Sequence, residues 1–239
     1  MHKYKEVYDE VLPEAKRASE RKNVILHAIV RPLCIWATLP LLDTKVKPTT
    51  ITKISVVASL AGFGFLAFGK TVLMQLIGWF LFFVWVILDG VDGNLARYKK
   101  QTSSMGEIWD SFGGYVAMVL TYFGTGIAAF YACNRFTFCD PYWMLILGGA
   151  TAIISIFPRL MMHKKRNTLG SKESTSEFTN KSGFGFVQTV AMNFISLSGL
   201  FQIIFITCIA LRLLNFFILF YFVLNTGMML ISLRSILKE

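Results

Sequence analysis

Three aspartates and an arginine stand at the end of one apolar segment and the start of the next, in the stretch LDGVDGNLARYKKQTSSMGEIWDSFGGY, residues 88–115. Asp89 and Asp92 are three residues apart, so on a helix their side chains share one face. Asp110 begins the following segment and joins them if the two helices are neighbours. Carboxylates at membrane depth are costly unless a cation compensates them. The pattern therefore predicts a metal site.

The residue types around the aspartates indicate the chemistry of such a site. Oxygen ligands without His or Cys favour a hard ion such as Mg²⁺, Mn²⁺ or Ca²⁺, which binds phosphate oxygens. Arg97, about two turns beyond Asp89 on the same helix, offers a fork of donors that grips phosphate. Gly93 and Gly106 leave room for a nucleotide close to the backbone. These residues point to pyrophosphate chemistry.

The same residues also fit two roles without phosphate chemistry. The aspartates can form ion pairs with Arg97, Lys99 and Lys100 at a helix end, with no further role. They can also line an ion path, because charged residues inside membrane segments mark the routes of ions through transporters. Both roles stay open on the residue types alone.

The spacing Asp89-x2-Asp92-Gly93-x2-Ala96-Arg97-x8-Gly106-x3-Asp110 resembles the signature of the CDP-alcohol phosphotransferase (CDP-alcohol phosphatidyltransferase) family. These are integral membrane enzymes that make phospholipids and related phosphodiesters. Upstream, residues 48–52 (PTTIT) resemble the family's Pro-Asn-x-x-Thr element at the start of the first span, with Thr49 in place of Asn. The similarity covers most of the chain after about residue 30.

The resemblance implies a role for each matching residue. Asp89, Asp92 and Asp110 match metal-binding aspartates of a two-metal site that takes Mg²⁺ or Mn²⁺. The residues that match or adjoin donor-binding positions for a CDP-linked molecule are Gly93, Arg97, Ser103 and Gly106. Family members attack the phosphorus of this donor with an acceptor hydroxyl and release CMP.

One position departs from the family pattern, which ends with a fourth aspartate where this chain has Gly114. That aspartate is usually given the role of general base and second-metal ligand. Glu107, one helical turn before Asp110, is a substitute base. Alternatively, the acceptor is a better nucleophile or carries its own base. A third interpretation is a relative with weak or no transferase activity.

The composition predicts an all-α integral membrane protein. The chain has 239 residues, is 54% hydrophobic and has a mean hydropathy of +0.55. We expect a bundle of six membrane-spanning helices, at about Thr50–Gly69, Thr71–Tyr98, Gly106–Cys133, Tyr142–His163, Phe186–Leu211 and Leu213–Leu237.

Amphipathic helices are expected before the first span. Tyr4, Val7, Tyr8, Val11 and Leu12 recur at helical spacing, which is typical of a helix on the membrane surface. The segment NVILHAIVRPLCIWATLPLLD, residues 23–43, is apolar but interrupted by prolines, and predicts a half-buried interfacial helix. We therefore divide the chain into interfacial helices at 1–48 and a six-helix membrane domain at 49–239.

The net charge of +10 is explained by Lys and Arg at the ends of apolar segments rather than by nucleic acid binding. With six spans, most of these residues fall on one side, which places both termini and the aspartates on the cytoplasmic side of the membrane. We expect this membrane to be a bacterial or archaeal plasma membrane. A homodimer is also expected. The aromatic stretch NFFILFYF, residues 215–222, is expected to face lipid or the dimer partner.

Two further features carry expectations. Arg159 lies within the fourth predicted span and needs an anionic partner, either an acidic acceptor or one of the aspartates. Cys133 and Cys139 flank a short polar turn and form a disulfide only if it faces an oxidising compartment.

The leading interpretation is a membrane transferase that moves a substituted phosphate from a CDP-activated alcohol or lipid to an acceptor hydroxyl, in phospholipid or lipid and glycan conjugate synthesis. Its partners are the CDP-linked donor, an alcohol acceptor and membrane lipids. The alternative is a silent relative that binds a CDP-linked ligand.

Overall fold

The computed structural model describes residues 4–21, 23–131, 134, 136, 140–169 and 193–237, and these contain helices and no strand. The long helices are α4 (Pro48–Phe68), α5 (Val72–Tyr98), α6 (Ser104–Tyr131), α7 (Tyr142–Leu169) and α11 (Leu214–Ile236). The short ones are α1 (Tyr4–Val11), α2 (Glu14–Arg21), η1 (Leu26–Val30), α3 (Arg31–Thr38), η2 (Leu39–Leu41) and α10 (Leu200–Ala210). The predicted all-α fold class is confirmed.

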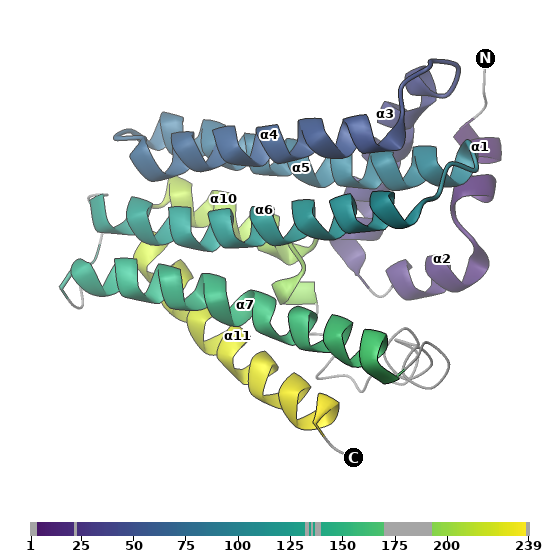
Figure 1. The fold of residues 1–239 in the computed structure, drawn as a ribbon. Coiled ribbons are helices and arrows are strands. Elements are labelled where there is room, and N and C mark those ends of the chain that lie inside the picture. The colour runs from purple at the N-terminus through teal and green to yellow at the C-terminus, as the bar shows by residue number, and fades with distance from the viewer. Residues whose placement is uncertain are drawn as a thin grey trace.

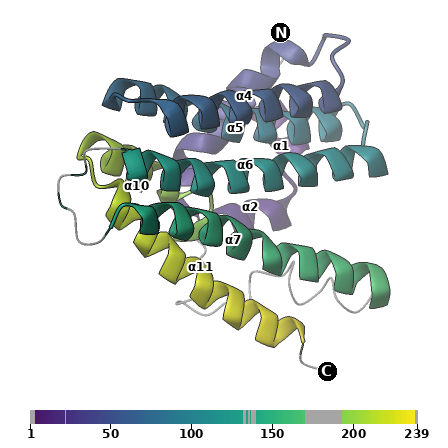
Figure 2. The ribbon, with the colours of Figure 1, turned by 60° about the vertical axis from the view of Figure 1, so that its left-hand side comes forward.

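The long helices α4 to α7 run back and forth beside one another, and α11 packs along α7 (Figures 1 and 2). α4 contacts α5 and α6, α6 contacts α7, and α10 contacts α5 and α11. The short helices α1, α2 and α3 gather at the end of the bundle where α5 ends and α6 begins (Figure 1). This end carries the acidic stretch.

Within the described residues, five helices are long and apolar enough to cross a membrane: α4, α5, α6, α7 and α11. They correspond to five of the six predicted spans, with ends that agree to within a few residues except at α7, which continues to Leu169. The remaining predicted span, Phe186–Leu211, starts outside the described residues, and its described part contains the short helix α10. The chain is thus a multi-pass membrane protein.

Helix starts follow local capping signals. The Thr71 hydroxyl accepts a hydrogen bond from the backbone N–H of Met74 at 3.2 Å at the start of α5. The Ser103 hydroxyl accepts one from the Gly106 N–H at 3.0 Å at the start of α6. Pro48 opens α4, where its missing N–H is harmless.

The cap at the end of α5 brings the start of α6 close to the end of α5. Lys100 takes a left-handed conformation with φ of 53°, and the N–H of Gln101 donates to the carbonyl of Ala96 at 2.9 Å. This is the hydrogen-bond pattern of a left-handed helix cap. It reverses the chain abruptly, so α6 starts only a few residues later, beside the end of α5.

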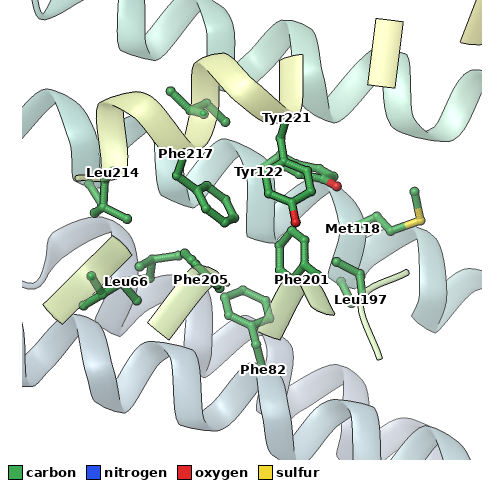
Figure 3. Close-up of a cluster of buried hydrophobic side chains, with 14 of the residues drawn as sticks. Leu66, Phe82, Met118, Tyr122, Leu197, Phe201, Phe205, Leu214, Phe217 and Tyr221 are labelled. Carbon is green, nitrogen blue, oxygen red and sulfur yellow. The ribbon is translucent and has the colours of Figure 1, made fainter. Parts of the chain in front are cut away.

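An aromatic cluster fills the middle of the bundle (Figure 3). Phe201 and Phe205 of α10 meet Phe217 and Tyr221 of α11, and Tyr122 of α6 completes the group. All five side chains are buried. Ring centroids are 4.5 Å apart for Phe217 and Tyr221 and 4.9 Å apart for Phe201 and Tyr221, within the range of favourable ring pairs.

The expectation for the aromatic stretch 215–222 is therefore wrong for two of its five rings. Phe217 and Tyr221, four residues apart on α11, pack into the core, while Phe216 and Phe220 are exposed. Because almost every residue of the stretch is apolar, its composition does not reveal which face is covered.

A position on the membrane surface is predicted for the N-terminal helix α1. The apolar face of α1 is covered by protein, since Val7, Val11 and Leu12 are buried against α3 and α5. The amphipathic pattern is present as expected, but the surface that it covers is the end of the bundle's own helices.

The segment from Leu26 to Leu41 forms one continuous helical run despite its prolines. Its first part, η1, is a π-helical turn in which the N–H of Arg31 donates to the carbonyl of Leu26. Pro32 follows in the first turn of α3. The wider turn accommodates a proline that would interrupt a regular helix.

A glycine contact between α6 and α7 gives a prediction for stability. A methyl group on Gly126 would lie 2.6 Å from the carbonyl oxygen of Met144 and 2.7 Å from the Cα of Gly148. Both atoms belong to backbone, so the helices must separate. We expect Gly126→Ala to lower the free energy of unfolding by about 1–3 kcal/mol.

Gly149 is the matched control, because a methyl group there meets nothing within 4 Å. Gly149→Ala should leave stability unchanged or raise it slightly, since alanine favours the helix. Thermal unfolding of both variants in one detergent measures the difference. Equal unfolding temperatures would contradict the close contact of α6 and α7.

Candidate active site

A cavity of about 480 Å³ opens at the end of the bundle where α5 ends and α6 begins. Its wall is built from α5, α6, α7, the N-terminal helices and the segment before α10. The lining includes the ionisable side chains of Glu20, Arg31, Asp89, Asp110, Arg159 and His163. A cavity with this many ionisable groups is a candidate site for a charged ligand.

Asp89 and Asp110 both line this cavity, from α5 and α6. Asp89 is half-buried and Asp110 is exposed. The structure thus brings to one cavity two carboxylates that are far apart in the sequence. This agrees with the expectation that their two helices are neighbours.

Asp92 lies outside the residues that line this cavity, although it is close enough to Asp110 for the two charges to interact. It is 4% exposed and accepts a hydrogen bond from the hydroxyl of Thr52 on α4, with 2.5 Å between Oγ1 and Oδ2. A separation of three residues turns the side chain by about 60° around the helix. This places Asp92 between α4 and α5, whereas Asp89 borders the cavity. Thr52 was not singled out from the sequence, although it belongs to the segment that resembles the family's opening element.

Arg97 is held in place by two acceptors. Its Nε donates to the backbone carbonyl of Val11 at 2.7 Å, and its Nη2 donates to Oδ1 of Asn94 at 3.0 Å. The guanidinium group also lies over Gly93, where an added methyl group would come within 3.3 Å of it. Gly93 therefore makes room for the arginine, and the end of α1 fixes the position of the arginine.

A buried ion pair connects this arginine to the cavity. Arg31 binds Glu20 through Nε at 2.8 Å and through Nη2, and both side chains are less than a tenth exposed. Nη1 of Arg31 lies 3.5 Å from Oδ1 of Asn94, the same oxygen that Arg97 contacts. Asn94 is fully buried and in turn donates to Thr38 at 3.2 Å. Of the residues in this network, only Arg97 was singled out from the sequence.

The first turn of α6 holds three further predicted site residues. Ser103 caps the helix through Gly106, and both lie outside the residues that line the cavity. Glu107 is exposed and also does not line it. The structure gives Ser103 a local role in starting α6.

Gly114 lies on the cavity wall, and a side chain added there meets nothing within 4 Å. His163 of α7 lines the same cavity, and its ring stands 6.1 Å from the ring of Tyr115. An isolated histidine at the end of an apolar segment has no spacing that marks it as functional. Only the pairing of α6 with α7 brings it to the cavity.

Arg159 lines the cavity one helical turn before His163. It is exposed rather than enclosed by protein. The predicted cation within the fourth span thus shares one open cavity with Asp89 and Asp110.

Cys34 and Gly90 close the cavity between α3 and α5. A methyl group on Gly90 would overlap the sulfur of Cys34, so the two helices touch here. Burial raises the pKa of the Cys34 thiol to about 12, which keeps it protonated at physiological pH. Cys133 and Cys139 lie outside the described residues.

The donor set suits a hard divalent ion. Asp89 and Asp110 offer carboxylate oxygens on one open cavity, and Mg²⁺ is commonly held by one or two carboxylates together with substrate phosphates. Within the described residues no three His, Cys, Asp or Glu side chains form a ready cluster. The arrangement therefore fits an ion that completes its ligands from the substrate.

Comparison with known proteins identifies the family. Residues 45–211 match the family model described as CDP-alcohol phosphatidyltransferase. The match includes α4, α5, α6 and α7, and with them Asp89, Asp92 and Asp110. No curated protein matches the sequence significantly. With this match over more than half of its length, the chain belongs to the CDP-alcohol phosphatidyltransferase family.

Proposed function

We propose that this membrane protein transfers a substituted phosphate from a CDP-linked alcohol or lipid to an acceptor hydroxyl. Family membership implies phosphatidyl transfer from a CDP-alcohol with release of CMP. The observation that carries the proposal for this chain is the pair Asp89 and Asp110, which line one cavity together with two arginines.

Asp89, Asp92 and Asp110 are the proposed ligands of Mg²⁺ or Mn²⁺ in a two-metal site. The second ion binds more weakly in this proposal, because Gly114 replaces one of its ligands. When bound, the ion draws charge from the phosphate oxygens and stabilises the charge that develops during displacement. Asp89 and Asp110, which line the cavity, would hold the ion from its wall. Asp92 is buried between α4 and α5 and, in this role, depends on the orientation that Thr52 gives it.

The hydrogen bond from Thr52 gives a prediction. Thr52→Val removes the hydroxyl but keeps the shape, and it leaves Asp92 buried without this donor. We expect the Mg²⁺ concentration for half-maximal activity to rise about 10- to 100-fold, as is usual when a residue that orients a metal ligand is lost. Thr52→Ser keeps the hydroxyl and should stay near the native value. Identical metal dependence of the two variants would contradict this role.

The donor is proposed to lie along Gly93, Arg97, Ser103 and Gly106. Arg97 is already fixed by Val11 and Asn94, so little side-chain freedom is lost when it binds a phosphate. Arg159 is the proposed contact of the acceptor, because it brings positive charge to the cavity that holds the aspartates. An acidic acceptor suits that position.

Gly114 has no side chain that could accept the proton of the acceptor hydroxyl. Glu107 is the base proposed from the sequence, one turn before Asp110. An acceptor that ionises by itself would need none. The second candidate function, a silent relative that binds a CDP-linked ligand, rests on the same glycine, because a glycine can neither take a proton nor bind a metal through a side chain.

The proposed setting is a homodimer with six spans, a domain of interfacial helices at 1–48 and a membrane domain at 49–239. The protein lies in a bacterial or archaeal plasma membrane, with both termini and the cavity facing the cytoplasm. The basic residues at the ends of α5 and α7, beside the cavity, support this orientation.

The proposal is tested by incubating the purified protein in nanodiscs with Mg²⁺, a panel of donors and a panel of acceptors. The donors are CDP-dioleoylglycerol, CDP-glycerol, CDP-choline and CDP-ethanolamine, and the acceptors are glycerol 3-phosphate, inositol 1-phosphate, serine and dioleoylglycerol. Turnover to a phosphodiester supports the transferase. Metal-dependent binding of a donor without turnover, converted to turnover by Gly114→Asp, supports the binding protein instead.

A further inference from the structure

The displacement requires a group that takes the proton of the acceptor hydroxyl, and this inference rests on the proposed transferase function. The missing side chain at Gly114 leaves a defined open space on the cavity wall, because an added Cβ there meets nothing within 4 Å. The group that replaces a carboxylate at this position must reach the same space from another element.

His163 is placed to do so. It lies on α7, which packs along α6, and it lines the cavity together with Gly114. Its ring centre is 6.1 Å from that of Tyr115, the residue next to Gly114, with the two rings inclined at 65°. The imidazole therefore lies on the same cavity as the position that the glycine leaves empty.

We propose that His163 is the general base of the transfer and acts in place of the absent carboxylate. The imidazole accepts the proton of the acceptor hydroxyl while the acceptor oxygen forms a bond to the phosphorus that carries the donor's alcohol. The bond from that phosphorus to the oxygen bridging the two phosphates breaks, and its electron pair leaves with CMP. The imidazolium then returns the proton to water.

The surrounding groups have other positions or other partners. Glu107 is exposed at the start of α6 and does not line the cavity. Glu20 is engaged by Arg31 in the buried ion pair. The charged and titratable groups that share the cavity with His163 are Asp110 and Tyr115 of α6, Asp89 of α5, Glu20, Arg31 and Cys34 from the N-terminal helices, and Arg159 of α7.

Proximity to Arg159 adds a reason for this choice. The two residues are four apart on α7, so they present neighbouring side chains to the cavity. An acidic acceptor held by Arg159 places its hydroxyl within reach of a group on the same helix face. α7 then supplies both the binding cation and the base.

The test compares native protein, His163→Gln, Gly114→Asp and the double variant Gly114→Asp/His163→Gln, with the donor and acceptor that give most CMP release. We expect His163→Gln to lower kcat about 10²- to 10⁴-fold and to leave the donor KM and Mg²⁺-dependent CDP binding unchanged. The double variant should regain much of the lost kcat. Its activity should also persist to lower pH, because a carboxylate loses its proton at lower pH than an imidazole.

His27→Gln is the matched control, since His27 lies in η1 outside the residues that line the cavity. Full activity of His163→Gln would overturn the inference, as would a loss that Gly114→Asp does not recover while CDP binding persists. A loss of both CDP binding and kcat in His163→Gln would also overturn it, because it would assign His163 to structure or binding. If the native protein releases no CMP from any donor, the proposed function falls together with this inference.

Discussion

Asp110→Asn lowers CMP release at least about a thousandfold at saturating donor. The carboxylate lines the same cavity as Asp89, where an ion held between the two would meet the donor phosphates. An amide keeps the size of the side chain but loses the negative charge that attracts the ion. A metal ion contributes several kcal/mol to such a displacement, and each 1.4 kcal/mol is about tenfold in rate.

Asp140→Asn is the control for this substitution. Asp140 lies at the far end of the bundle, before α7, and its side chain accepts a hydrogen bond from the N–H of Tyr142 at 2.9 Å. Asparagine serves equally well at such a position, so activity should stay near native. The measurement is the Mg²⁺ dependence of CMP release and of CDP binding. Native Mg²⁺-dependent CDP binding by Asp110→Asn would contradict the placement of the metal.

Glu20→Ala destabilises the N-terminal helices by about 3–5 kcal/mol, the second large effect expected, because it leaves Arg31 buried without its carboxylate partner. The loss extends to the cavity, because Arg31 shares Asn94 with Arg97. We therefore expect a lower unfolding temperature and faster proteolysis within residues 4–30.

The double variant Glu20→Leu/Arg31→Met distinguishes the cost of an unpaired buried charge from the loss of side-chain packing. Replacement of both partners of a buried pair by apolar residues is often neutral or stabilising, so much of the stability should return. Glu14→Ala, at an exposed position on the same helix, should have little effect. If Glu20→Ala and Glu14→Ala unfold at the same temperature, the buried pair contributes nothing.

The sequence predicted most of the elements that position the site, because long apolar segments and their charged ends are strong signals. It also predicted that Asp89 and Asp110 come to one site, since both stand beside one short connection. It did not show that Asp92 turns toward Thr52, because the side of a helix that faces a neighbour depends on how the helices pack. A shared face at three-residue spacing still spans about 60°.

Further parts of the site depend on contacts between segments far apart in the chain. Glu20 and Arg31 are ordinary charges in a charged N-terminus until α2 and α3 fold beside the cavity. The apolar face of α1 was visible in the sequence, but not what covers it. His163 has no neighbour in sequence that marks it, and only the packing of α7 on α6 brings it to the cavity that Gly114 lines.

The most direct measurement of the central claim is the stoichiometry of the reaction. The native protein is incubated with the best donor, its acceptor and Mg²⁺, and CMP and the phosphodiester product are quantified by chromatography and mass spectrometry. We predict one phosphodiester for each CMP, with both absent when EDTA removes the metal. CMP without a phosphodiester, or equal product formation in the presence of EDTA, would contradict a metal-dependent transfer to an acceptor hydroxyl.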